Sequence, residues 1–121
     1  MGSRWKVLVV DDDDSLRRAL ARTLRRAGYD VEAYRSADEL AEAGACCVDA
    51  CLVLDVNLPG TSGIDFRRAL EDAGQHPPTI FITALDREDT TALASFAPIA
   101  VLHKPFRNED LLSAVDRVCR N

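Results

Sequence analysis

Short apolar segments alternate with amphipathic segments along the chain, and this alternation constrains the fold more than any other feature. Val7–Val10 is apolar at every position, as expected of a strand covered on both faces. The next segment repeats leucine every fourth residue, which is typical of a helix with one buried side. The predicted strands are 7–10, 30–34, 50–54, 79–83 and 99–104, and the predicted helices lie between 13 and 28, between 36 and 44, and at 64–73, 88–96 and 108–119. Five strands alternating with five helices predict an α/β fold with a parallel sheet between two helical layers.

The predicted helix ends carry the residue types that cap helices. Asp13 and Asp14 are suited to the beginning of the first helix, and Gly28 to its end. Ser36 followed three residues later by Glu39 forms a capping box. Asn108 is the predicted N-cap of the last helix.

Composition narrows the functional classes. The chain of 121 residues predicts a single domain over 1–121, in which Met1–Ser3 resemble the remnant of a cloning site. Its net charge of -5 argues against direct nucleic-acid binding. No apolar run is long enough for a membrane span or a signal peptide, so we expect no membrane association and a cytoplasmic protein. The four cysteines lack zinc-site spacing and are predicted to be free thiols.

Polar side chains follow the central strands at the point where each strand ends. Asp11 and Asp12 follow the first strand, and Asp55, Thr83 and Lys104 end the third, fourth and fifth. The carboxyl ends of parallel strands meet at one edge of the sheet, which is where ligands bind in such folds. We therefore expect three carboxylates, a hydroxyl and an ammonium group to converge there.

This set of groups suits phosphoryl chemistry. Clustered carboxylates repel one another and favour a cation, and Mg²⁺ prefers oxygen ligands. Asp55 is a candidate covalent acceptor because carboxylates act as nucleophiles in phosphoryl transfer. Lys104 and Thr83 are suited to contact phosphoryl oxygens. Each of these groups also has a structural interpretation. The acidic residues would form a solvated rim, and Thr83 would be present because threonine favours strands. Lys104 would be a solvent-facing side chain.

Four motifs in order, VLVVDDD, LVLDVNLPGTSG, FITA and HKPF, resemble the receiver domain of bacterial two-component response regulators. The resemblance extends over nearly the whole chain and implies the flavodoxin-like fold with strand order 2-1-3-4-5. The Asp55–Gly63 loop is similar to that of receivers that precede a helix-turn-helix effector. The resemblance thus implies signalling rather than an enzyme, with transcription as an expected output.

The resemblance also implies a role for each site residue. Asp55 would be phosphorylated by a sensor histidine kinase or a histidine phosphotransfer protein. Asp12 would bind Mg²⁺ directly, Asp11 would bind it through water, and the backbone carbonyl of Asn57 would complete the ligand set together with Asp55. Thr83 would be the switch hydroxyl, and Lys104 would pair with the phosphate. An effector domain outside this chain and a homodimer that forms on phosphorylation are further expectations.

The sequence departs from the receiver pattern near the last strand. Receivers usually carry Tyr or Phe three residues before the lysine, where this chain has Val101, and the usual Gly-Ala before that strand is replaced by 97–100. The phosphorylation chemistry is unaffected, but the route to the output surface differs. One hypothesis is that the weakly helical segment 88–96 itself changes on phosphorylation. A second is that Leu85 hinders the water that hydrolyses the acyl phosphate.

Alternatives remain open at this stage. Asp11-x-Asp13-x-Ser15 also fits a Mg²⁺-dependent phosphatase of the haloacid dehalogenase type, with Asp11 as nucleophile. A receiver-like module that binds partners without phosphorylation is a third interpretation. The first helix has a surface rich in arginine, formed by Arg17, Arg18, Arg22, Arg25 and Arg26. This surface is interpreted either as solvated or as a docking site for an acidic kinase or phosphotransfer partner.

Overall fold

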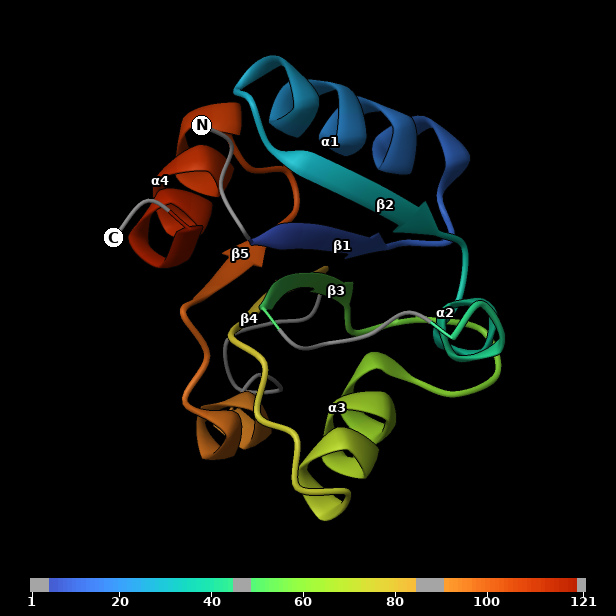
Figure 1. Ribbon diagram of the computed structural model, residues 1–121. Coiled ribbons are helices and arrows are strands. Elements are labelled where there is room, and N and C mark those ends of the chain that lie inside the picture. The colour runs from blue at the N-terminus through green and yellow to red at the C-terminus, as the bar shows by residue number, and fades with distance from the viewer. Residues whose placement is uncertain (1–4, 45–48, 85–90, 120–121) are drawn as a thin grey trace.

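The chain folds around a five-stranded parallel sheet. The structure is a computed structural model that describes residues 5–44, 49–84 and 91–119. Its strand order is β2-β1-β3-β4-β5, and every neighbouring pair is parallel, which confirms the predicted topology (Figure 1). The strands are β1 (Lys6–Val10), β2 (Asp30–Tyr34), β3 (Ala50–Asp55), β4 (Thr79–Thr83) and β5 (Ala100–His103).

Helices cover both faces of this sheet (Figure 1). On one face lie α1 (Asp14–Arg26) and α4 (Asn108–Cys119), and on the other lie α2 (Ala37–Glu42), α3 (Gly63–Asp72) and the 3-10 helix η1 (Thr91–Phe96). Two hydrophobic cores result, one on each face. Alternate residues of β1 supply both cores, Val7 and Val9 to the first and Leu8 and Val10 to the second. This two-sided burial explains why the central strands are continuously apolar.

The ends of the helices match their predicted caps with one exception. The Asp13 carboxylate accepts a hydrogen bond from the Leu16 backbone N–H at the start of α1, and Ser36 Oγ accepts one from the Glu39 N–H at the start of α2. Gly28 follows α1 with a φ of 97°, in the left-handed region that favours glycine. The prediction for Asn108 was wrong by one position: Asn108 is the first helical residue of α4, and Arg107 precedes the helix.

One predicted α-helix differs in the structure. The described part of the chain contains four α-helices instead of the expected five, and η1 lies between β4 and β5, where the fourth helix was predicted. Of the predicted helix 88–96, residues 88–90 lie outside the described residues. The low helix propensity of threonine at this position, and Pro98 shortly after it, favour a short 3-10 turn over a regular helix.

Two further sequence expectations can be examined in the structure. Cys51 and Cys119 are buried thiols outside any disulfide, as predicted, whereas Cys46 and Cys47 lie outside the described residues. Among the helices of the described ranges, none combines the length and the apolar character that a membrane crossing requires.

Candidate functional site

The polar residues predicted to meet at the carboxyl edge of the sheet do lie at that edge. Asp11 directly follows β1, Asp55 ends β3, Thr83 ends β4 and Lys104 directly follows β5. Backbone hydrogen bonds continue the sheet across these ends, from Val56 N to Ile82 O at 2.9 Å and from Lys104 N to Thr83 O at 2.9 Å. The register of the strands therefore fixes the backbone positions from which these side chains extend at the sheet edge.

Three carboxylates form the acidic part of the site. One ligand oxygen from each of Asp11, Asp12 and Asp55 lies within 4.8 Å of the other two. Asp11 is 0% exposed and Asp55 is 2% exposed, whereas Asp12 is exposed to solvent. Two of the three negative charges are thus held in the protein interior, where water screens their repulsion weakly.

The protein interior perturbs the carboxyl group of Asp11. Burial raises its pKa from 3.8 to about 6, and the negative charge of Asp55 acts in the same direction, against a hydrogen bond from the Asp13 backbone. That bond reaches Asp11 Oδ1 at 2.9 Å. The other oxygen, Asp11 Oδ2, is buried and accepts no hydrogen bond. A buried carboxylate oxygen without a donor is costly, so this atom is available to a cation.

Lys104 supplies part of the missing positive charge. Its Nζ donates a hydrogen bond to Asp55 Oδ2 at 3.0 Å and forms an ion pair with Asp11 Oδ2 at 3.5 Å. Burial disfavours its ammonium form, but the hydrogen bond to Asp55 and the charge of Asp11 outweigh burial and raise the pKa of Lys104 above its ordinary value. Lys104 is therefore charged at neutral pH and balances one of the three carboxylates.

The backbone around Asp55 is held tightly. The Asn57 N–H donates to Asp55 Oδ1 at 2.9 Å, so both carboxylate oxygens of Asp55 have a donor. Gly63 begins α3 directly against this residue: a Cβ atom at position 63 would lie 2.2 Å from the Asp55 carbonyl oxygen. Only glycine permits this approach, which fixes α3 and the intervening loop beside Asp55.

Thr83 lies at the same edge but on the next strand. Its neighbour Ile82 is the register partner of Asp55, and Thr83 itself pairs with His103 of β5. The Thr83 side chain is buried. This position places the threonine between the acidic cluster and the η1 side of the molecule.

The donor set fits a hard divalent cation. Every candidate ligand is an oxygen, three carboxylates approach one another closely, and Asp11 Oδ2 is a buried acceptor without a donor. Lys104 alone leaves the cluster with excess negative charge. Asn57, the fourth predicted contributor, is exposed and adjacent to Val56, which places it at the rim of the cluster.

Two contributors were missed by the sequence reasoning. Gly63 lies within the LVLDVNLPGTSG motif, but its close approach to Asp55 depends on how α3 packs and has no sequence signal beyond the glycine itself. Arg17 donates from Nη1 to the Asp11 backbone carbonyl at 3.1 Å and from Nη2 to Asp14 at 2.6 Å. Its position one turn into the first helix was the available signal.

Of the predicted departures, Val101 can be placed in the structure. It is partly buried and packs against the core on the α2 and α3 face. Leu85 lies outside the described residues.

Comparisons with known proteins agree with this arrangement. Residues 7–116 match the family model described as "Response regulator receiver domain". The chain is 43% identical over 110 residues to Nodulation protein W of Bradyrhizobium diazoefficiens, covering 90% of this chain and 48% of that protein. It is 35% identical over 116 residues to the transcriptional regulatory protein TdiR of Thauera aromatica, covering 95% and 51%. The chain thus spans about half the length of these curated relatives.

The fold has a close counterpart among solved structures. The chemotaxis response regulator CheY4 of Vibrio cholerae superimposes with a TM-score of 0.81 at 33% identity, covering 94% of this chain and 98% of that one. The family match extends from β1 to α4 and includes every residue of the acidic edge described above. This chain belongs to the family of response regulator receiver domains, which are signalling proteins of two-component systems.

Proposed function

We propose that Asp55 accepts a phosphoryl group from a phosphohistidine on a sensor histidine kinase or a histidine phosphotransfer protein. The observation that carries this proposal is the position of Lys104, whose ammonium group touches both Asp55 and Asp11 within the acidic cluster. An ammonium held on the acceptor carboxylate is suited to stabilise the charge of an incoming phosphoryl group.

The transfer conserves atoms and electrons without a redox partner. A lone pair of an Asp55 carboxylate oxygen forms a bond to phosphorus as the phosphorus–nitrogen bond breaks. The histidine nitrogen leaves with that electron pair, and the product is an acyl phosphate on Asp55. Because Asn57 N–H and Lys104 each hold one oxygen of Asp55, the carboxylate is oriented before the donor arrives.

Asp11, Asp12 and Asp55, with the backbone carbonyl of Asn57, are the residues that would hold Mg²⁺. When bound, this ion would neutralise the charge that accumulates on the phosphoryl oxygens. Asp11 contributes the buried oxygen that lacks a donor, and the Asp13 N–H keeps its carboxylate in place. Lys104 holds the Oδ2 atom of the acceptor Asp55 through its hydrogen bond.

A hollow beside the site supports contact with the donor protein. It has a volume of about 370 Å³ and lies between α1 and the segment that joins β5 to α4. Apolar side chains line it next to Lys104, which suits a helix that presents its phosphohistidine to Asp55. The lining residues are Asp13, Leu16, Ala19, Leu20, Lys104, Pro105, Phe106 and Asn108.

The output of phosphorylation would involve Thr83 and the η1 side. A phosphoryl group on Asp55 adds acceptor oxygens that the Thr83 hydroxyl can approach, and η1 is a short 3-10 segment on that side. We further propose that the whole of 1–121 acts as one cytoplasmic receiver, that it is not an enzyme in its own right, and that an effector domain or a homodimer carries the response. TdiR, about half of whose length this chain covers, is named a transcriptional regulatory protein, which favours transcription as the output.

The test is intact mass after treatment with acetyl phosphate or phosphoramidate and Mg²⁺. We expect the wild-type mass to rise by one phosphoryl group, about 80 Da, and the mass of Asp55→Asn to stay unchanged. Asp65→Asn, which removes an exposed carboxylate at the start of α3, is the matched control and should be phosphorylated normally.

One contact in the structure and two experimental outcomes bear on the alternative functions. Asp13 caps α1 through its side chain, which gives this carboxylate a structural role and disfavours the phosphatase interpretation. Turnover of a phosphate ester that requires Asp11 and persists in Asp55→Asn would support that interpretation instead. A wild-type protein that gains no mass would support a receiver-like module that binds without phosphorylation.

A further inference from the structure

An arginine-lined groove lies between α1 and the edge strand β2, and at its Arg17 end it adjoins the acidic site through the Asp11 backbone carbonyl. Its volume is about 540 Å³. Two of its lining residues are alanines and all the others are arginines: Arg17, Arg18, Ala21, Arg22, Arg25, Arg26 and Ala33. None of these residues lines the hollow next to Lys104 that we assign to the phosphoryl donor.

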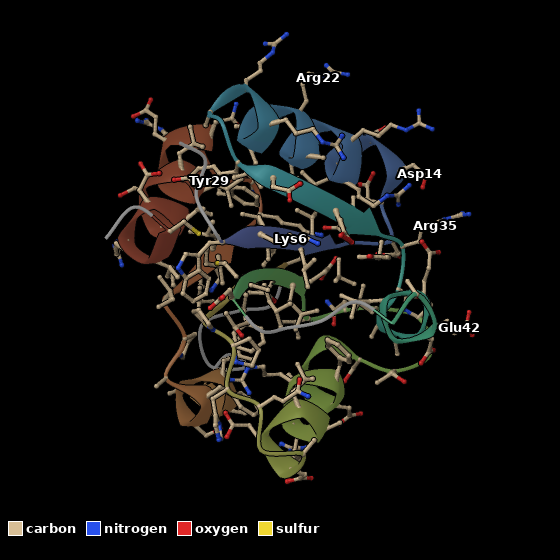
Figure 2. All side chains as sticks on the ribbon, in the orientation of Figure 1. Lys6, Asp14, Arg22, Tyr29, Arg35 and Glu42 are labelled. Carbon is tan, nitrogen blue, oxygen red and sulfur yellow. The ribbon has the colours of Figure 1, made fainter. Side chains whose placement is uncertain are left out.

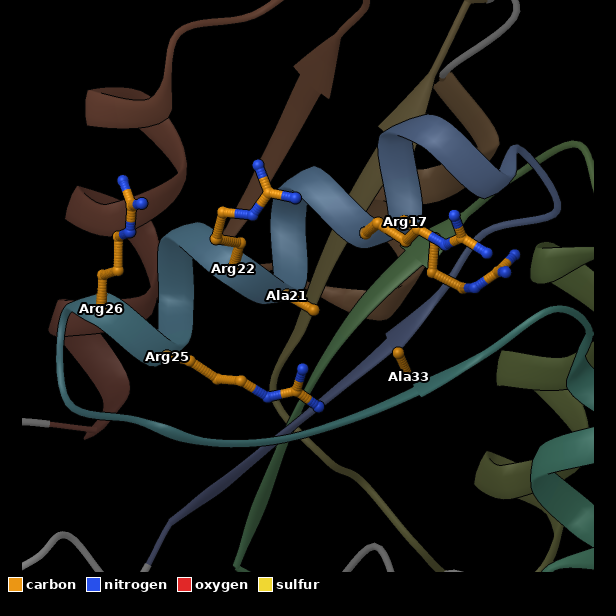
Figure 3. Close-up of a pocket in the computed structure, with 7 residues that line it drawn as sticks. Arg17, Ala21, Arg22, Arg25, Arg26 and Ala33 are labelled. Carbon is orange, nitrogen blue, oxygen red and sulfur yellow. The ribbon is translucent and has the colours of Figure 1, made fainter.

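The groove exists because two small side chains face its floor. Arg17, Ala21 and Arg25 are spaced by four residues and therefore share one side of α1. Figure 3 shows Ala21 between the two arginines, with Ala33 of β2 on the opposite side of the gap. Larger side chains at either alanine would fill this space. Arg18, Arg22 and Arg26 form the adjacent stripe of the helix, and Figure 2 shows Arg22 pointing outward from α1.

Two guanidinium groups at the ends of the groove are fixed by the protein itself. Arg17 donates to the Asp11 carbonyl at 3.1 Å and pairs with Asp14 at 2.6 Å. Arg25 donates from Nη2 to the Val31 carbonyl at 3.2 Å. Each guanidinium has five N–H donors, so these bonds orient the groups and leave further donors available. Fixed donors lose less conformational entropy when they bind a ligand.

The charge of the groove is unbalanced. Helix α1 carries five arginines and one aspartate, although the whole chain has a net charge of -5. Among the described residues that line the groove none is acidic, and Asp14 pairs with the groove at its Arg17 end. Neighbouring guanidinium groups repel one another, so an anion in the groove would be attracted and would relieve that repulsion.

We propose that this groove binds a phosphate ester of nucleotide size. Its volume lies in the range of about 300–1,000 Å³ that is typical of small-molecule sites, and is larger than inorganic phosphate requires. Arginine forks bind phosphate oxygens in pairs, and their planar faces stack on aromatic rings such as nucleobases. The alanine floor leaves room for such a ring between the arginines. The site is independent of Asp55 chemistry.

The test is titration calorimetry with ADP, in EDTA and without a phosphodonor, so that neither Mg²⁺ nor phosphorylation of Asp55 affects the result. We expect saturable binding to the wild type, weakened about tenfold or more by Arg22→Gln or Arg25→Gln, each of which removes a charged donor. Arg25→Lys keeps the charge but loses the fork and should also bind less tightly. Arg68→Gln, which changes an exposed arginine of α3, is the matched control and should bind as the wild type does.

Amide chemical shifts locate the site, since ADP should move the signals of Ala21 and Ala33. Arg22 is exposed on α1, so Arg22→Gln remains informative if Arg25→Gln unfolds. Absence of saturable ADP binding would overturn the proposal. Equal weakening by Arg68→Gln would also overturn it, as would binding of polyglutamate or duplex DNA without binding of ADP. If polyglutamate bound and ADP did not, the groove would be a docking surface for an acidic protein.

Discussion

Two charges are buried at opposite edges of the same sheet, and their surroundings differ sharply. Arg67 of α3 is 2% exposed and lies at the amino end of β4, whereas Asp11 is 0% exposed and lies at the carboxyl edge. Arg67 donates from Nε to Thr79 Oγ1 at 2.9 Å and from Nη2 to the Pro77 carbonyl at 3.3 Å. Its Nη1 pairs with Glu71 at 2.7 Å, and its guanidinium lies 5.4 Å from the centre of the Phe96 ring.

Asp11 has no such set of partners. One of its oxygens accepts a backbone hydrogen bond, and the other is buried with only the Lys104 charge 3.5 Å away. The comparison teaches that a buried charge can serve stability or binding, and that its partners distinguish the two. Arg67 Nη1 also makes no hydrogen bond, but the Glu71 carboxylate lies 2.7 Å from it, so the charge of Arg67 is compensated by the fold and Arg67 ties α3 to β4. Asp11 is left partly uncompensated, at a cost that a bound cation would recover.

The largest expected effect is at Arg67. We expect Arg67→Met to lower the free energy of unfolding by about 2–4 kcal/mol, because the side chain bonds to three partners that would lose it together. Urea denaturation measures this change. Phosphorylation of Asp55 in the folded fraction should persist, since Arg67 lies at the other edge of the sheet. A stability close to that of the wild type would break the comparison, because Arg67 would then not be the structural charge.

The second effect has the opposite sign. We expect Asp11→Asn to raise the free energy of unfolding by about 1–3 kcal/mol at pH 8 without Mg²⁺, since one pKa unit corresponds to about 1.4 kcal/mol. Burial raises the Asp11 pKa to about 6, so the folded protein holds this carboxylate ionised at a cost. Asparagine keeps an oxygen for the Asp13 N–H and removes the charge. The same variant should lose Mg²⁺-dependent phosphorylation.

The stability gained by Asp11→Asn should depend on pH. A carboxyl group whose pKa is higher in the folded state destabilises the fold fully above that pKa, and ceases to do so below the unfolded value. The advantage of Asp11→Asn should therefore be complete above about pH 6 and vanish as the pH falls toward 4. Urea midpoints of both proteins across this range measure it. An advantage that stays constant with pH would show that the charge of Asp11 is not its source.

The sequence predicted the sheet and the acidic edge because both depend on local patterns. Continuous apolar strands such as Val7–Val10 require cover on two faces, and this requirement places Asp11 and Asp55 at a common edge. The sequence analysis expected an α-helix where η1 lies, because strands and helices alternate elsewhere. The low helix propensity of threonine and the nearby Pro98 leave a short 3-10 segment that packs on the core through Leu93 and Phe96. The sequence could not predict that Arg67 is buried, because its partner Thr79 lies beyond a turn and only the packing of α3 brings them together.

A smaller effect should follow from adding the cation to the wild type. Mg²⁺ at ten times its dissociation constant should stabilise the folded state by about 1.4 kcal/mol, because it binds the folded acidic cluster and not the unfolded chain. Thermal denaturation with and without MgCl₂ measures this shift. Asp12→Asn removes the exposed ligand and should abolish most of the shift, whereas Arg67→Met should retain it. A shift of equal size in Asp12→Asn would place the ion elsewhere.

The smallest effect separates two neighbouring arginines of α3. Arg68 is exposed and pairs with Asp65 at 3.5 Å, one helical turn away, where water screens both charges. Such surface pairs contribute little, and we expect Arg68→Met to change the free energy of unfolding by less than about 0.5 kcal/mol in urea titrations. The substitution matches Arg67→Met in chemistry and in helix, so only burial and partners differ between them. If both variants lost the same free energy of unfolding, the loss would come from placing methionine in α3. Arg67 would then not be a charge that stabilises the fold, and its contrast with Asp11 would fail.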